Sequence, residues 1–401
     1  MNHDQELFRA VSPFQARQNR RHFMKQAGAL GVSSLALISL LEACGGQTAT
    51  TTTSTTSSTA NLAGPIDMQT LITNAKKEGK LEAIGFPRDW ANYGTILDSY
   101  TAKYVPVAYK AEAEYSSAQE LETFQKSKLH PHGDVGDVGF TFGSKAVQQG
   151  LISPYKHANW DDVPANLKDP DGYWCTEYWG TQAFVVNTDI VKNPPTSFKD
   201  LLTGNYKNMV GIDGDPRQAT DAFIAVYSAA LATSGSIDSI QPGIDFFAKL
   251  KKNGNFTPAR SSSANIAKGE VAIGILWDYL GLGYRDQLQG KPNLKILIPS
   301  DGSIAGPYVS VINKTAPHPY AARLWMEYIF SDEGQLDYLK GYAHPARYQK
   351  LASEGKVPAD LAAKLPAAEQ YANVKFVTDS TKLDAATALL KQNWQSQVLG
   401  Q

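Results

Sequence analysis

The chain has 401 residues, of which 42% are apolar and 19% are charged, with 32 Gly and 21 Pro. This composition is that of globular proteins, and it excludes a wholly disordered, collagen-like or coiled-coil chain. The net charge of −1 argues against a broad nucleic-acid-binding surface, because such a surface needs a basic excess. The two cysteines exclude a disulfide-dense scaffold.

The N-terminal residues 1–44 have the pattern of an export signal. Arg20 and Arg21 precede an uncharged run at 27–41, which is shorter than the ~20 residues of a spanning helix. The segment NRRHFMK (19–25) is similar to a twin-arginine signal, and LEAC (41–44) is similar to a lipobox, which implies lipidation at Cys44. A plain signal peptide with an incidental cysteine and a membrane-spanning anchor are the alternatives. Residues 45–65 form a Ser/Thr-rich linker that is too polar to pack.

Short apolar runs then alternate with amphipathic helices. We expect strands at 81–86, 105–109 and 137–140. The pattern SAQE (117–120) is a capping box that opens one helix. The helix before it places five apolar residues on one face by three-four spacing: Tyr93, Ile96, Leu97, Tyr100 and Tyr104. This β-α-β-α-β succession predicts a parallel sheet covered by helices.

A second alternation of strands and helices follows. We expect strands at 181–187, 209–212, 271–276, 294–298 and 309–313, with helices between them and a mostly helical remainder. The fold class is therefore α/β, with two units. Because ligands of open parallel sheets lie outside the carboxyl ends of the strands, two facing units predict a ligand cleft between them.

Candidate ligand-binding residues lie next to the expected strand ends. Aromatic faces combined with a few carboxylates are suited to an organic cation. Asp278 is the strongest candidate, because it follows an apolar strand, where a bare carboxylate is costly unless it is paired. A helix-capping role for Asp89 and a turn-forming role for Asp215 stay open. The full set is Arg88, Asp89, Trp90, Thr141, Trp179, Asp215, Trp277, Asp278, Tyr279 and Tyr308.

Patterns of catalysis are missing from the sequence. It contains no nucleophile elbow, phosphate-binding loop, HExxH or CxxC motif. The close histidine pair, His130 and His132, lies beside Pro131 and Gly133, as in a surface loop. We therefore expect no enzyme activity, no cofactor and no metal site. A secreted enzyme with a spatially assembled triad and a sensory or adhesion domain are less favoured alternatives.

Seven short motifs occur in an order and spacing that resemble a known family: AKKEGK (75–80), DVGDVG (134–139), DPDGYW (169–174), VNTD (186–189), KGEVA (268–272), APHP (316–319) and SDEG (331–334). Through them residues 66–347 resemble the bacterial extracellular solute-binding proteins of ABC importers, in the group with ferric-iron, aminoethylphosphonate, thiamine and polyamine binders. The resemblance implies a type II periplasmic-binding fold that closes on solute by hinge motion. Lobe 1 would be 66–187 plus 306–401, and lobe 2 would be 188–305. The resemblance also implies ABC permease subunits and a small-molecule solute as partners, with no nucleic acid. It further implies an extracytoplasmic, lipid-anchored location.

The residues after the KGEVA motif bear on the solute. Iron binders of the resembling family hold ferric ion with two adjacent tyrosines at this place. Here Tyr279 matches one of them, and Leu280 stands where the other is expected. Asp278 between aromatic residues suits an amine, and Arg88 or Arg217 would pair with an acidic end of the solute. We expect a small amine-bearing solute, polyamine-like or aminophosphonate-like. A ferric or other metal ion is the alternative within the same class.

Overall fold

The computed structural model describes residues 62, 66–109, 116–366, 368–371 and 373–400. The chain divides into two units, Met1–Ser58 and Thr59–Gln401, and the described residues all belong to the second. The expected export signal, Cys44 and most of the linker therefore lie outside the described residues. Among the helices that the structure describes, none combines the length and apolar character needed to cross a bilayer.

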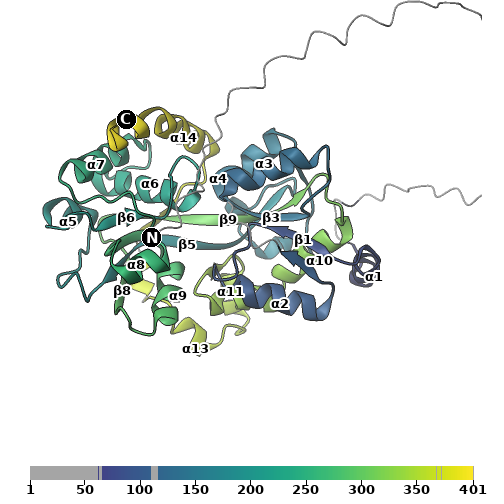
Figure 1. Ribbon diagram of the computed structural model, residues 1–401. Helices are drawn as coiled ribbons and strands as arrows, with labels where there is room; N and C mark the ends of the chain where they lie inside the picture. The colour runs from purple at the N-terminus through teal and green to yellow at the C-terminus, as the bar shows by residue number, and fades with distance from the viewer. Residues whose placement is uncertain (1–61, 63–65, 110–115, 367, 372, 401) are drawn as a thin grey trace, which may run out of the picture. The chain divides into compact units, whose positions relative to one another are not determined.

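Two long strands connect the two lobes of the second unit. The sheet has the order β2-β1-β3-β9-β5-β7-β6 along its main path. Strands β5 (Trp174–Asn187) and β9 (Ser303–Asn313) pair antiparallel and lie side by side from one lobe to the other (Figure 1). They are the crossover strands of the expected fold. Every residue of β9 and nearly every residue of β5 is buried.

The first lobe is built on a parallel sheet. Strand β1 pairs parallel with β2 and with β3, and β3 then pairs antiparallel with the second half of β9. The elements of this lobe are α1 (Met68–Glu78), β1 (Leu81–Ile84), α2 (Tyr93–Lys103), β2 (Val107–Tyr109), α3 (Ser117–Ser127), β3 (Val135–Gly139), α4 (Phe140–Gln148), β4 (Ile152–Ser153), the short helices η1 (Trp160–Asp162) and η2 (Ala165–Leu167), α10 (Pro319–Ile329) and α11 (Asp332–Lys340).

The second lobe repeats this plan on the other half of β5. Strand β7 pairs antiparallel with β5 and parallel with β6, and β8 also pairs with β5. Helix α6 is buried over most of its length, since its first twelve residues lie in the core. The elements are α5 (Phe198–Thr203), β6 (Val210–Ile212), α6 (Thr220–Ser234), α7 (Gln241–Lys252), α8 (Ser263–Lys268), β7 (Ile273–Trp277), α9 (Asp278–Leu288) and β8 (Leu294–Leu297).

The C-terminal segment packs against both lobes. Helix α14 packs against α7 of the second lobe and against α4 of the first, and η4 packs against α7. The Trp394 ring lies 5.6 Å from the Phe247 ring of α7. The expected lobe 1 includes this segment, which contacts helices of both lobes. The elements of the segment are β10 (His344–Pro345), α12 (Tyr348–Ser353), α13 (Ala359–Ala362), η3 (Ala368–Tyr371), β11 (Val374–Phe376), α14 (Ser380–Trp394) and η4 (Gln395–Leu399).

A pair of glycines marks the point where the crossover strands pass between the lobes. Gly180 of β5 pairs with Gly306 of β9 in the strand register. A Cβ atom on Gly306 would lie 2.0 Å from the Trp277 ring, and one on Gly180 would lie 2.4 Å from the Tyr279 ring. The missing side chains thus allow the buried start of α9 to approach the crossover closely.

Both expected helices of this region form. The first buries the predicted face, and the N-cap of the second differs from the prediction. In α2 the predicted face is buried through Tyr93, Ile96, Leu97 and Tyr100. The capping box of α3 uses Ser116 and Gln119, one residue earlier than the predicted pattern. The Ser117 hydroxyl instead accepts a hydrogen bond from the Gly139 N–H at 2.9 Å.

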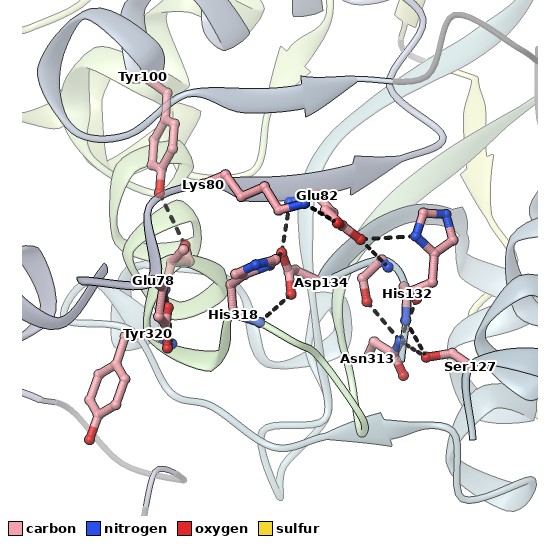
Figure 2. A network of polar contacts seen from close by, with 12 residues as sticks. Glu78, Lys80, Glu82, Tyr100, Ser127, His132, Asp134, Asn313, His318 and Tyr320 are labelled. Carbon is pink, nitrogen blue, oxygen red and sulfur yellow. Dashed lines mark hydrogen bonds and ion pairs between the residues drawn. The ribbon is translucent and has the colours of Figure 1, made fainter. Parts of the chain in front are cut away.

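A buried carboxylate ties the outer edge of the first lobe together. Asp134 is fully buried, and its oxygens accept hydrogen bonds from the Glu82 N–H at 2.6 Å and the His318 N–H at 2.7 Å. The His318 ring also lies 2.8 Å from Asp134 Oδ2, and Figure 2 shows this cluster. The carboxylate therefore joins β1 to the segment that enters α10.

The substitution Asp134→Ala is expected to lower the free energy of unfolding by about 3 kcal/mol, since it leaves two buried N–H groups and the His318 ring without an acceptor. Urea unfolding followed by circular dichroism measures this loss. As a control, Asp238→Ala removes a surface ion pair with Lys382 and should lower the free energy of unfolding much less, because exposed ion pairs contribute little. Equal losses in the two variants would contradict the role given to Asp134.

Candidate ligand-binding site

One cavity of about 220 Å³ lies between the two lobes. This volume is below the range of about 300–1,000 Å³ that is usual for drug-sized ligands, so the cavity fits a small solute. The first lobe contributes Gly85, Pro87, Asp89, Trp90, Ser116, Ser117, Gln119, Glu120 and Asp137 to its lining. The second lobe contributes Asp213, Gly214, Asp215, Gln218, Ala219, Thr220, Asp221, Arg260, Leu280 and Tyr284. Tyr308 contributes from the crossover strand β9.

The N-termini of two helices from opposite lobes meet at this cavity. The Ser117 hydroxyl of α3 lies 3.4 Å from the Thr220 hydroxyl of α6. Each helix carries an acidic residue in its first turn, Glu120 in α3 and Asp221 in α6, and both residues line the cavity. A helix N-terminus attracts anions, and here the protein supplies the negative charge itself.

Four buried carboxyl groups line the cavity: Asp213 pairs with Arg260, and the other three are Glu120, Asp137 and Asp221. Glu120 accepts a hydrogen bond from the Asp137 N–H at 3.0 Å, and Asp137 accepts one from the Tyr178 hydroxyl at 3.1 Å. Asp221 accepts one from the Gln182 side chain at 2.6 Å. Within the described residues, none of the three is in an ion pair with a lysine, arginine or histidine. Burial therefore raises the pKa of all three carboxyl groups well above its ordinary value.

The basic side chain at the cavity already has acidic partners. Arg260 is the basic residue among the described lining residues, and its Nε donates to Asp213 Oδ1 at 2.6 Å. Asp215 is similarly engaged, since Arg217 donates to both of its oxygens. The positive charge of each arginine is paired with an aspartate, so the lining is acidic overall.

Aromatic rings close one side of the cavity. Trp90 and Tyr308 line it, and their ring centroids lie 5.8 Å apart. The Trp90 indole N–H donates to the Tyr178 hydroxyl at 2.8 Å, which fixes the ring. Tyr284 of α9 contributes a further ring. Rings beside carboxylates form the setting in which ammonium groups are bound.

Four of the ten predicted binding residues line this cavity: Asp89, Trp90, Asp215 and Tyr308. Two of the others lie at the crossover, where Trp277 and Tyr279 are buried beneath the paired glycines. Arg88 is exposed and pairs with Asp98. Thr141 lies in the first turn of α4, and Trp179 stacks on His344 at 4.0 Å. These six residues are outside the described cavity lining.

Asp278, the strongest candidate from the sequence, has protein partners instead. It is fully buried, and its oxygens accept hydrogen bonds from the Thr181 N–H at 3.0 Å and the Tyr371 hydroxyl at 2.8 Å. It joins the start of α9 to β5 and η3 and does not line the cavity. The expectation that a carboxylate here needs a partner is correct, but the partners found belong to the protein: two backbone amides, the Tyr371 phenol and, at 3.7 Å, the His344 ring.

The lining residues absent from the prediction include four acidic ones. Asp137 lies inside an apolar strand, Glu120 lies in a helix-capping pattern, and Asp213 lies in a turn sequence. Asp221 gives no sequence signal beyond its place near a helix start. A search for acidic residues in the first turn of helices that follow a strand would have found Glu120 and Asp221.

Metal binding has little support in this geometry. In the part of the chain that the structure describes, no three His, Cys, Asp or Glu side chains gather as they would around a metal ion. The Tyr279 ring is buried and lies 5.7 Å from the Tyr178 ring. The donor set at the cavity consists of separate carboxyls and aromatic rings.

Two α/β lobes joined by two crossover strands, with a cavity between them, define a type II periplasmic-binding fold. The family model of the bacterial extracellular solute-binding proteins matches residues 134–378, more than half of the chain. The chain belongs to this family, and the resemblance drawn from its sequence motifs is confirmed.

The chain is similar to proteins named for different solutes. It is 26% identical over 252 residues to a Salmonella typhimurium periplasmic protein named for 2-aminoethylphosphonate binding, which covers 61% of this chain and 70% of that one. It is 24% identical over 302 residues to iron uptake protein A2 of Synechocystis, covering 69% and 85%. The periplasmic binding protein AfuA of Actinobacillus pleuropneumoniae, solved with fructose-6-phosphate, has a TM-score of 0.64 at 20% identity, covering 80% and 98%.

Proposed function

We propose that this protein is the solute-binding subunit of an ABC importer and captures a small amine in the interlobe cavity for delivery to permease subunits. The observation that carries the choice of solute is the set of buried carboxyls Glu120, Asp137 and Asp221, which line one cavity with no basic side chain paired to them among the described residues. Such groups are costly in the core unless a cation joins them.

The same lining favours an amine without an acidic group over an aminophosphonate. A phosphonate would meet the carboxyls that already occupy the first turns of α3 and α6. Arg260 and Arg217 pair with Asp213 and Asp215 and would have to leave them to hold an acidic end. A polyamine-like solute, whose charge is wholly positive, meets neither obstacle.

Calorimetric titration of protein that was purified without denaturation tests this proposal. The compounds to compare are putrescine, 2-aminoethylphosphonate, fructose-6-phosphate and ferric citrate. We expect putrescine to bind at one per chain and 2-aminoethylphosphonate to bind at least about tenfold more weakly, a difference of about 1.4 kcal/mol. Binding of the phosphate or the ferric ion in preference to both amines would contradict the proposal.

We also infer that the protein is exported through the twin-arginine signal and anchored by a lipid at Cys44, as residues 19–25 and 41–44 indicate. Expression with labelled palmitate should label the wild-type chain and leave Cys44→Ser unlabelled and released from the membrane fraction. Label retained in Cys44→Ser, or a wild-type chain without label, would show that the cysteine is incidental.

A further inference from the structure

A further buried carboxyl group, that of Glu177, lies next to Asp137, one of the acidic residues that line the cavity. Glu177 of β5 is fully buried, and Asp137, which lines the cavity, is 3% exposed. The two carboxyl groups interact with each other, and we call them the carboxyl pair. Asp137 Oδ1 is buried and has no donor among the described residues, so a proton held by the pair would supply the hydrogen-bond donor that it lacks.

The surroundings of the carboxyl pair supply phenols and no positive charge. The Tyr93 hydroxyl donates to Glu177 Oε1 at 2.9 Å, and the Tyr338 hydroxyl donates to Oε2 at 2.8 Å. Tyr178 donates to Asp137 Oδ2, while Asp137 Oδ1 has no donor among the described residues. The titratable groups that face the pair are Tyr93 on α2, Glu120 on α3, Cys175 and Tyr178 on β5, Tyr279 on α9, Tyr308 on β9 and Tyr338 on α11.

Because no described cation faces the carboxyl pair, its two members do not both ionise in the empty protein. Burial raises the pKa of Glu177 to about 7, and burial followed by the charge of Glu177 raises the pKa of Asp137 well above its usual range. An ammonium group in the cavity would change this balance, because it brings the positive charge that the pair lacks.

We propose that Asp137 and Glu177 hold one proton between them in the empty protein, and that a solute ammonium group bound at Asp137 takes its place. The inference rests on the proposed function. In this exchange the carboxyl O–H bond breaks, its electron pair stays on the carboxylate oxygen, and the proton passes to the buffer. The ammonium group keeps all of its own protons. Uptake of the solute and release of a proton are then one linked equilibrium.

The sign of the pH dependence follows from this linkage. Below the pKa of the pair in the empty protein, the solute must displace a proton, so acid opposes binding. The dissociation constant of putrescine should fall by up to tenfold per pH unit as the pH rises, and the slope should vanish above the pKa at which the pair loses its last proton. The importer would therefore load best in neutral surroundings.

A titration of the empty protein tests the proton itself. NMR of isotope-labelled aspartate and glutamate carboxyl carbons, with the two signals assigned by their loss in Asp137→Asn and Glu177→Gln, should show one protonated carboxyl in the pair near pH 7. Signals of Asp137 and Glu177 that both stay ionised down to about pH 4, the ordinary range for carboxyls, would overturn the proposal. This measurement uses no solute and so is independent of the proposed function.

Calorimetry with putrescine tests the exchange. Titrations near pH 6 in two buffers of different ionisation enthalpy should give about one proton released per putrescine bound. In Glu177→Gln the proton release should fall to near zero and the pH dependence should flatten. Glu327→Gln is the matched control, since Glu327 is also a buried carboxyl bonded to a tyrosine, Tyr155, and does not line the cavity. It should keep the wild-type slope.

The possible failures can be told apart. Putrescine binding with no proton release would overturn the exchange and leave the proposed function standing. No putrescine binding at any pH would overturn the proposed function and the exchange with it, while the Asp137 and Glu177 signals would still show whether the proton is present. If Glu177→Gln does not fold, the proton count and the titration of the wild-type protein decide the matter.

Discussion

The substitution Asp221→Asn should lower the affinity for putrescine at least about 100-fold, because it removes a charge that is buried at the cavity. Asparagine keeps the shape of the side chain and an oxygen to accept from Gln182, but it loses the second oxygen that accepts from the Trp277 N–H. Because the substitution also removes a buried acid without a paired cation among the described residues, the free energy of unfolding should change by no more than about 1 kcal/mol. Calorimetry gives the affinity, and urea unfolding confirms that the variant is folded.

A matched control for this variant is Asp278→Asn. Asp278 is also a buried aspartate in the first turn of a helix, but it binds Thr181 and Tyr371 and does not line the cavity. Its affinity for putrescine should stay within about threefold of wild type, a difference of about 0.65 kcal/mol. Loss of binding in Asp278→Asn with retention in Asp221→Asn would restore the ligand-binding role predicted for Asp278 and would contradict the role of the acidic cavity.

The second large effect is expected at the crossover. Gly306→Ala places a methyl group 2.0 Å from the ring of Trp277, which is fully buried and donates to the Tyr308 hydroxyl at 3.2 Å. Neither the ring nor the paired strands can shift freely, so the free energy of unfolding should fall by about 3 kcal/mol. Guanidinium unfolding monitored by tryptophan fluorescence measures this change.

The control for this variant is Gly283→Ala in α9. No atom would lie within 4 Å of its new Cβ, and its backbone has no left-handed conformation. Alanine is the better helix former, so this variant should be more stable than wild type by about 0.5–1 kcal/mol. If Gly306→Ala unfolds within about 0.5 kcal/mol of wild type, the close approach at the crossover is not a constraint on the fold.

The strands show how far the sequence predicts the fold. The runs at 81–86 and 209–212 correspond to β1 and β6, because a short apolar run between turn residues is a strong strand signal. The crossover strands are longer than predicted. The expected strand at 181–187 is the second half of β5. The first half of β5 is rich in aromatic residues and shows no alternation of apolar and polar residues, because both of its faces are buried. Likewise Gly306 and Pro307 lie inside β9, although these residue types usually indicate a turn.

The site was less predictable than the fold. Trp90 and Tyr308 follow or precede expected strands, and proximity to strand ends was enough to select them. The acidic lining of the cavity depends on the contact between α3 and α6. These helices carry Glu120 and Asp221, which are about a hundred residues apart in the chain. No local pattern carries that information. For Asp278 the partners are 97 and 93 residues away, so a structural carboxylate could not be distinguished from a ligand contact.

We expect the interlobe cavity to hold a small amine. Native mass spectrometry of the protein purified without denaturation tests this expectation most directly, because it reports the solute that the chain carries from the cell. We expect a bound species of one small amine per chain, lost in Asp221→Asn and retained in Asp278→Asn. A bound metal ion, or a phosphate or phosphonate compound that persists in Asp221→Asn, would contradict the account.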